Sequence, residues 1–165
     1  LYVIVFLANG LNYVSVVYCL LTSALIVLSV LDFRTMEIAD GINLFILLLG
    51  IAATLLDLHA WKDHVIGMFS VSVFLLVIYL VTVGRGIGGG DIKLMFGAGL
   101  LLGWKGAVLA FFLGCIIGSV VHLIRMAVSH AEHRLAMGPY LSVGIWLTAL
   151  WGTPVIDWYI GMIIH

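Results

Sequence analysis

The chain has 165 residues, of which 64% are apolar and 9% are charged, and its mean hydropathy is +1.29. Soluble domains average about 45–50% apolar and about 25% charged residues, so this composition excludes a soluble enzyme, a disordered linker and a disulfide scaffold. The net charge of −1 provides no basic surface, and we expect no nucleic-acid partner. A chain this apolar needs the lipid bilayer as part of its solvent.

The first apolar stretch, residues 1–8, is too short to cross a bilayer, and the sequence Asn-Gly-Leu-Asn at 9–12 predicts a turn after it. The chain begins inside this stretch without a Met. We therefore interpret 1–8 as the end of a truncated helix and expect the chain to be the back part of a longer protein.

A helix needs about 20 apolar residues to cross a bilayer. Six later stretches are predicted as spans: 13–31, 42–56, 65–83, 94–104, 106–124 and 140–152. The predicted fold is an all-α, polytopic membrane helix bundle, with residues 1–165 as one membrane-embedded domain and a short tail, 158–165, after Pro154. The stretch 94–104 is short and could re-enter the same face, but we prefer six crossings.

The basic residues predict the orientation, because short loops rich in Lys and Arg stay in the cytosol. With six crossings, five basic residues share one side and two lie on the other. The five are Arg34, Arg85, Lys93, Arg125 and Arg134, and the two are Lys62 and Lys105. If 94–104 returns to its own face, the division is four against three. In either case loops 32–40 and 84–93 face the cytosol, which predicts a multi-pass membrane protein.

Two carboxylates are expected at the same membrane depth on different helices. Asp32 ends a 19-residue span that contains no charge, and Asp91 follows a run with five glycines in seven residues, 84–90. A carboxylate at a bilayer edge is costly unless it meets water, a partner or a substrate, so both are functional candidates. The alternative is that each Asp only marks where its helix leaves the membrane.

The glycines favour the functional interpretation. Each costs about 1 kcal/mol relative to Ala inside a helix, but glycines permit an irregular backbone and the close approach of another chain. Two facing carboxyls can share a proton, because both cannot easily ionise at close range. One can then activate a water against a peptide carbonyl while the other donates to the oxyanion and the leaving amine, which is aspartyl-protease chemistry.

Three motifs together resemble those of type IV prepilin peptidases, which are membrane aspartyl proteases. The stretch GGGDIKLM at 88–95 resembles the family's GxGD-x-K-[LM] signature. Asp32 with Ile-Ala-Asp at 38–40 resembles its D-x5-I-P-D motif, with Ala39 in place of Pro. The stretch AMGPYL at 136–141 resembles its Gly-Pro entry into the last helix. The three motifs occur in the family's order and extend over nearly the whole chain.

This resemblance implies that Asp32 and Asp91 are the catalytic pair and that Gly88 and Gly90 belong to the active-site loop. It implies cleavage of the leader of type IV prepilins and pseudopilins on the cytosolic side, after a Gly. Many members also methylate the new amino terminus with S-adenosylmethionine and carry a preceding segment with two CxxC pairs that looks zinc-binding. This sequence has no CxxC. We expect no cofactor for proteolysis, and S-adenosylmethionine and zinc only with such a segment.

Other polar residues have weaker interpretations. Lys93 could steady the Asp91 carboxylate or tether the leader, or it could be a cytosolic anchor. Glu37 and Asp40 could attract a basic leader, although a solvated acidic loop is the preferred interpretation. His130, Glu132 and His133 have spacing that could suit a metal, but a solvated loop is favoured and we predict no metal site.

Three other functions stay open at this stage. An archaeal-type preflagellin peptidase shares the GxGD motif. A small cation transporter could use the same two Asp residues. We find no inverted repeat, and both acids lie near one surface rather than at the midplane, which argues against a transporter. A membrane scaffold would leave the paired acids unexplained. A homodimer is also considered, with lipid and prepilins as the expected partners.

Overall fold

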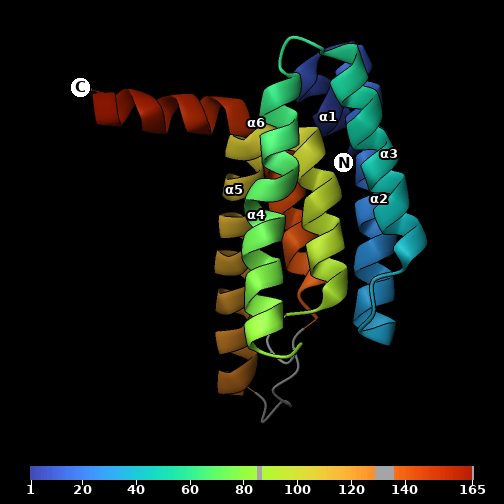
Figure 1. Ribbon diagram of the computed structural model, residues 1–165, viewed down its shortest axis with the longest axis vertical. Coiled ribbons are helices and arrows are strands. Elements are labelled where there is room, and N and C mark those ends of the chain that lie inside the picture. Colours follow the sequence, from blue (N-terminus) through green and yellow to red (C-terminus); the bar gives the residue numbers. More distant parts are fainter. Residues whose placement is uncertain (85–86, 129–135, 165) are drawn as a thin grey trace.

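The computed structural model describes residues 1–84, 87–128 and 136–164, and within these ranges it contains six helices and no strand. The helices are α1 (Tyr2–Asn9), α2 (Tyr13–Thr35), α3 (Asp40–Leu56), α4 (Trp61–Val81), α5 (Gly89–Val128) and α6 (Gly138–Ile164). Figure 1 shows α2, α3, α4, α5 and the first part of α6 running along one common axis. The predicted all-α class is confirmed.

The surface of the bundle is apolar as well as its core. Leu21, Leu28 and Leu94 are fully buried, whereas Phe74 and Leu80 are exposed on the outside. Large apolar side chains on an outer surface are compatible with lipid as the surrounding medium. Among the described residues, α2, α4 and α5 are long and apolar enough to cross a membrane, and α3 is a shorter apolar helix. A membrane helix bundle is the architecture that fits these properties.

Helix α5 contains the two predicted stretches 94–104 and 106–124 as two legs. Gly103, near the end of the first stretch, divides the two legs, with a φ of 73° and a ψ of 174° that no helical residue has. The first leg starts where α4 ends, and at its far end Gly103 lies against Asp63 in the first turn of α4. The leg therefore runs the length of the bundle, which supports a crossing rather than re-entry into the same face.

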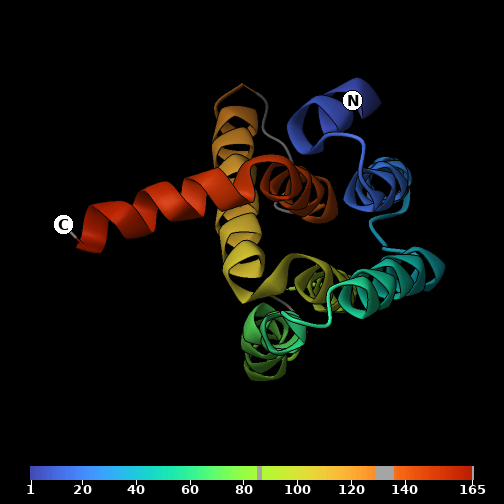
Figure 2. The ribbon, with the colours of Figure 1, turned by 90° about the horizontal axis from the view of Figure 1, so that it is seen from above.

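The two ends of the chain are also helical. Residues 1–8 were predicted as the end of a helix, and the structure has α1 there, followed by Gly10 with a φ of 72°. Helix α6 continues through Pro154 into the predicted tail, and its last part projects sideways from the bundle in Figures 1 and 2. Proline removes a helical hydrogen bond and is a common cause of such bends. His165 lies outside the described residues.

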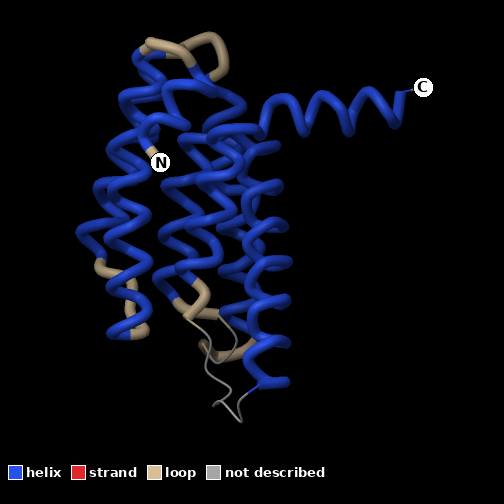
Figure 3. Tube along the Cα trace, turned by 180° about the vertical axis from the view of Figure 1, so that it is seen from behind, coloured by secondary structure: helices blue, strands red, loops and turns tan. Residues whose placement is uncertain are grey.

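The loops that carry the sequence motifs meet at one end of the bundle. The loop between α2 and α3 and the segments that lead into α5 and α6 lie at the same end in Figure 3. Lys62 and Lys105 belong to the opposite end, because one lies in the first turn of α4 and the other just after the kink of α5. The antiparallel order of the helices thus places Asp32 and Asp91 at one level.

Candidate active site

A cavity of about 900 Å³ lies where α2 ends and where α5 and α6 begin. Its lining residues are Leu31, Asp32, Thr35, Met36, Glu37, Ile38, Ala39, Asp40, Gly84, Ile87, Gly88, Gly89, Gly90, Asp91, Ala136 and Met137. Six of the seven residues predicted for the site are in this set, and Lys93 is the exception. Three segments that are distant in the sequence form one concave site, as expected for a binding or catalytic cavity.

Asp32 lies in the last turn of α2 and is only 4% exposed. Its Oδ2 accepts a hydrogen bond of 2.9 Å from the backbone N–H of Gly138, the first residue of α6. The N–H groups at the start of a helix have no partner within the helix, and the helix dipole favours a negative charge there. The beginning of α6 therefore holds one oxygen of the Asp32 carboxylate in place.

Gly138 is a site residue that sequence reasoning missed, although the stretch 136–141 was recognised as a motif. An ideal Cβ at this position would lie 2.5 Å from Asp32 Oδ2. Only a residue without a side chain allows the carboxylate to reach the backbone N–H. The sequence signal is the pair Gly138-Pro139, because proline is favoured in the first turn of a helix.

Asp91 lies in the first turn of α5 and is 7% exposed. Its Oδ1 is buried and has no hydrogen-bond partner in the described part of the chain. Its Oδ2 faces Gly88, where an ideal Cβ would be only 3.1 Å away. A buried acceptor without a partner is unfavourable unless it carries a proton or meets water or a substrate.

The two carboxylates share one cavity but differ in their surroundings. Their charges interact electrostatically; the Asp32 carboxylate contacts the N-terminus of α6, and Asp91 lies in the first turn of α5. One Asp32 oxygen is bound by a backbone donor, whereas Asp91 Oδ1 is left for a further partner. Such a pair can divide the tasks of general base and general acid between its members.

The comparison with known proteins agrees with this geometry. Residues 19–123, more than half of the chain, match the type IV leader peptidase family. The chain belongs to this family. The matched segment contains both Asp32 and Asp91.

Several curated relatives of this leader peptidase family member carry the name prepilin leader peptidase/N-methyltransferase. The protein from Aeromonas salmonicida is 31% identical over 152 residues, which cover 88% of this chain and 52% of the relative. The protein from Bacillus subtilis is 35% identical over 143 residues, covering 85% and 57%, and that from Pseudomonas aeruginosa is 30% identical over 148 residues, covering 86% and 51%. The chain thus spans about half the length of these relatives. No solved structure matches it.

The loop between α2 and α3 is where this family member has Ala39 at the position of the family's usual Pro. Ala39 has a φ of −63°, close to the value that a proline ring imposes, so the exchange keeps the backbone conformation. Met36 before it has a φ of 53° and ends α2, with its N–H bound to Asp32 O at 2.9 Å. An ideal Cβ on Gly90 would lie 2.8 Å from Ile38 Cβ. Gly90 therefore allows this loop to close over the start of α5.

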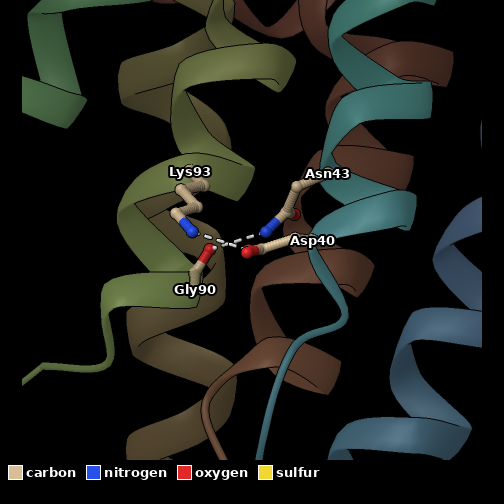
Figure 4. Close-up of polar contacts among 4 residues, drawn as sticks. All are labelled: Asp40, Asn43, Gly90 and Lys93. Atoms are coloured by element: carbon tan, nitrogen blue, oxygen red, sulfur yellow. Dashed lines mark hydrogen bonds and ion pairs between the residues drawn. The ribbon is translucent and has the colours of Figure 1, made fainter.

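Lys93 lies outside the cavity and makes an ion pair with Asp40, with 2.6 Å between Nζ and Oδ1 (Figure 4). Asn43, which sequence reasoning did not select, donates a hydrogen bond of 3.4 Å from Nδ2 to Gly90 O. Glu37 is exposed on the cavity wall, as is Asp40. The acidic loop residues thus lie at the cavity, while the basic side chain that follows Asp91 is turned toward α3.

Metal binding was considered for His130, Glu132 and His133, which lie outside the described residues, as do Arg85, Gly86 and Arg134. Within the described ranges, no group of three or more His, Cys, Asp or Glu side chains could hold a metal ion.

Proposed function

We propose that this chain is the membrane-embedded catalytic part of an aspartyl endopeptidase that removes the leader of type IV prepilins and pseudopilins. The observation that carries the proposal is that Asp32 and Asp91, from two different helices, line one cavity. The family supports peptidase chemistry, and the names of the relatives support prepilins as the substrate class. Cleavage after a Gly, before the mature part of the substrate, is included in the proposal.

The different surroundings of the two carboxylates suggest which one acts as general base and which one as general acid. Asp32 accepts a hydrogen bond from a backbone N–H, which stabilises its ionised form, so it takes a proton from the attacking water. Asp91 carries the shared proton and donates it to the carbonyl oxygen as the water oxygen bonds to the carbonyl carbon. When the tetrahedral intermediate collapses, the carbon–nitrogen bond breaks, the proton held by Asp32 goes to the leaving amine, and one hydroxyl of the intermediate returns its proton to Asp91. The products are a carboxylic acid and a free amino terminus, and one water is consumed.

The distribution of basic residues supports a cavity that opens to the cytosol. Arg34, Lys93 and Arg125 lie at the cavity end of α2 and α5, whereas Lys62 and Lys105 lie at the opposite end. Basic residues favour the cytosolic side. We therefore place the protein in the bacterial inner membrane with the cavity toward the cytosol, where the leader of the substrate is located.

Glu37 and Asp40 are candidates for attracting a basic leader peptide. Both line the cavity, but the charge of Asp40 is compensated by Lys93 at 2.6 Å. Glu37 is the stronger candidate of the two, and its contribution is expected to weaken as salt is added because the site is open to water.

Methylation of the new amino terminus is proposed only for a longer protein. The relatives' names include N-methyltransferase, but this chain spans about half their length. S-adenosylmethionine and zinc enter the proposal through a preceding segment of the kind found in many family members. No residue of the cavity is assigned to methyl transfer.

The proposal is tested by cleavage of a detergent-solubilised prepilin by the unmodified chain and by Asp32→Asn and Asp91→Asn. We expect each variant to lose about 100-fold to 10⁴-fold of its activity, the usual contribution of acid–base catalysis. Asp57→Asn is the matched control, because Asp57 is exposed and ends α3 at the opposite end of the bundle. Full activity in either cavity variant overturns the assignment of that residue.

The same assay separates the alternative functions. A preflagellin peptidase would cut a preflagellin faster than a prepilin. A cation transporter would cut neither substrate, and its Asp variants would change cation uptake into liposomes. If the unmodified chain cuts neither substrate, the full-length protein is assayed before proteolysis is rejected.

A further inference from the structure

Two polar contacts join the first turns of α3 and α5 (Figure 4). Asp40 pairs with Lys93 at 2.6 Å, and Asn43 Nδ2 donates to Gly90 O at 3.4 Å. In both helices the two contributing residues are three positions apart, so they lie on the same helix face. We call these four residues the clasp. Asp91 lies between the two α5 residues of the clasp and directly follows Gly90.

Asn43 is an unusual residue at this position if its only role is packing. Its side chain is 5% exposed inside an apolar helix, and its Oδ1 is buried without a partner in the described part of the chain. Burying an amide that is only partly hydrogen-bonded is unfavourable, and an apolar side chain of the same size would pack at lower cost. The amide is therefore better explained by its contact with Gly90 than by stability.

The ion pair of the clasp is also a weak stabiliser. The side chains of Lys93 and Asp40 are 58% and 76% exposed, and exposed pairs contribute about 0–1 kcal/mol. The pair instead fixes the position of the first turn of α3 relative to the first turn of α5, next to the cavity. Asp40 itself lines the cavity.

The placement of Asp91 depends on the backbone that carries it. Asp91 Oδ1 has no partner among the described residues, and the carboxylate is hydrogen-bonded to the backbone of Gly88, which belongs to the same segment of the chain. The Gly90 backbone packs closely on Ile38, where an ideal Cβ would be 2.8 Å from Ile38 Cβ. The segment that follows Asp32 in the sequence therefore holds the turn that carries Asp91 through Ile38, Asp40 and Asn43.

We propose that Asn43 is a positioning residue, which acts with the Asp40–Lys93 pair to hold Gly90 and Asp91 at the correct distance from Asp32. This inference rests on the proposed function. A displacement of about 1 Å at a catalytic group can lower a rate about 100-fold. The contact between Asn43 and Gly90 does not touch the reacting atoms, so its loss is expected to lower kcat without changing substrate binding.

The first test is Asn43→Leu in the whole chain, with kcat, KM and Tm measured in the same detergent. We expect kcat to fall between about 10-fold and 100-fold, with KM unchanged and Tm unchanged or higher. Ser72→Ala is the matched control, because Ser72 is 4% exposed, lies on α4 and has no partner for its hydroxyl in the described residues. Its kcat should equal that of the unmodified chain. A lower Tm with unchanged kcat per folded molecule shows a merely structural Asn43 and overturns the inference.

The second test reverses the ion pair with Asp40→Lys, Lys93→Asp and the double variant. If attraction between α3 and α5 positions Asp91, each single variant lowers kcat and the double variant restores it. If the single variants raise KM and the double variant does not restore it, Asp40 acts on the substrate instead, and the pair has no part in positioning. Single variants with unchanged kcat also overturn the role of the pair.

The outcomes separate this inference from the proposed function. If the unmodified chain cleaves, Asp32→Asn does not, and Asn43→Leu cleaves at the normal rate, only the positioning role is wrong. If neither the unmodified chain nor the full-length protein cleaves a prepilin, the proposed function fails and the positioning role fails with it.

Discussion

The two ends of the helix bundle both depend on glycine, but for different purposes. At the end away from the cavity, Gly67 of α4 and Gly99 of α5 lie backbone to backbone. At the cavity end, Gly138 and Gly88 lie against the carboxylates of Asp32 and Asp91. The first arrangement brings two helices close together, as small residues do in membrane bundles. The second leaves room for the two carboxylates that line the cavity.

The atom that an added Cβ would meet distinguishes glycines needed for helix packing from glycines needed at the cavity. A side chain added where the neighbour is backbone forces two helices apart, and the effect should appear in the stability. A side chain added where the neighbour is a carboxylate moves that group, and the effect should appear in the rate. The four predictions below test this separation, from the largest expected effect to the smallest.

Gly138→Ala should lower kcat by about 100-fold, because the new Cβ would lie 2.5 Å from Asp32 Oδ2 and displace the carboxylate from the α6 N-terminus. The measurement is prepilin cleavage together with a thermal melt. Gly161→Ala in the same helix is the control, since nothing lies within 4 Å of its added Cβ. Normal cleavage by Gly138→Ala would contradict the role given to this hydrogen bond.

Gly67→Ala should lower the free energy of unfolding by about 2 kcal/mol, within the range usual for overpacking. Its Cβ would lie 2.7 Å from the backbone nitrogen of Trp104, so α4 and α5 have to separate. Unfolding in detergent measures the loss, and kcat per folded molecule should be unchanged. A normal stability with a lower kcat would show that the two ends are not independent.

Gly88→Ala should lower kcat by about 10-fold, less than Gly138→Ala because the contact is looser. The added Cβ would lie 3.1 Å from Asp91 Oδ2, which can shift slightly to make room. Steady-state cleavage measures the effect, and KM should be unchanged. An effect on KM alone would indicate that Gly88 contacts the substrate rather than Asp91.

Gly41→Ala should raise the free energy of unfolding by about 0.5–1 kcal/mol and leave cleavage unchanged. Gly41 lies in the first turn of α3, and nothing lies within 4 Å of the Cβ that alanine would add. The gain comes from the smaller conformational freedom of the unfolded chain. A loss of stability in the same unfolding experiment would show that this turn has a constraint other than space.

The sequence alone was sufficient for the helical class, for the approximate positions of the helices and for bringing Asp32 and Asp91 to one end of the bundle. The length of an apolar stretch can be read directly from the sequence. Because consecutive spans cross the membrane in opposite directions, the number of spans between two residues predicts whether they lie at the same end of the bundle. The positions of Gly88 and Gly90 beside Asp91 also follow from their neighbourhood in the chain. The spans predicted at 94–104 and 106–124 are joined in α5, and the kink lies at Gly103, inside the first predicted stretch rather than at Lys105 between the two.

Only the tertiary structure decided which polar atoms meet. The contact of Asp32 with the Gly138 N–H joins residues from α2 and α6, and the pairing of Lys93 with Asp40 joins α5 to α3. The amide of Asn43 reaches Gly90 in the same way. Composition and periodicity describe each helix separately, whereas these contacts depend on how far one helix is shifted and rotated against another. That register results from packing between segments distant in the sequence, and so it is determined only when the whole bundle is assembled.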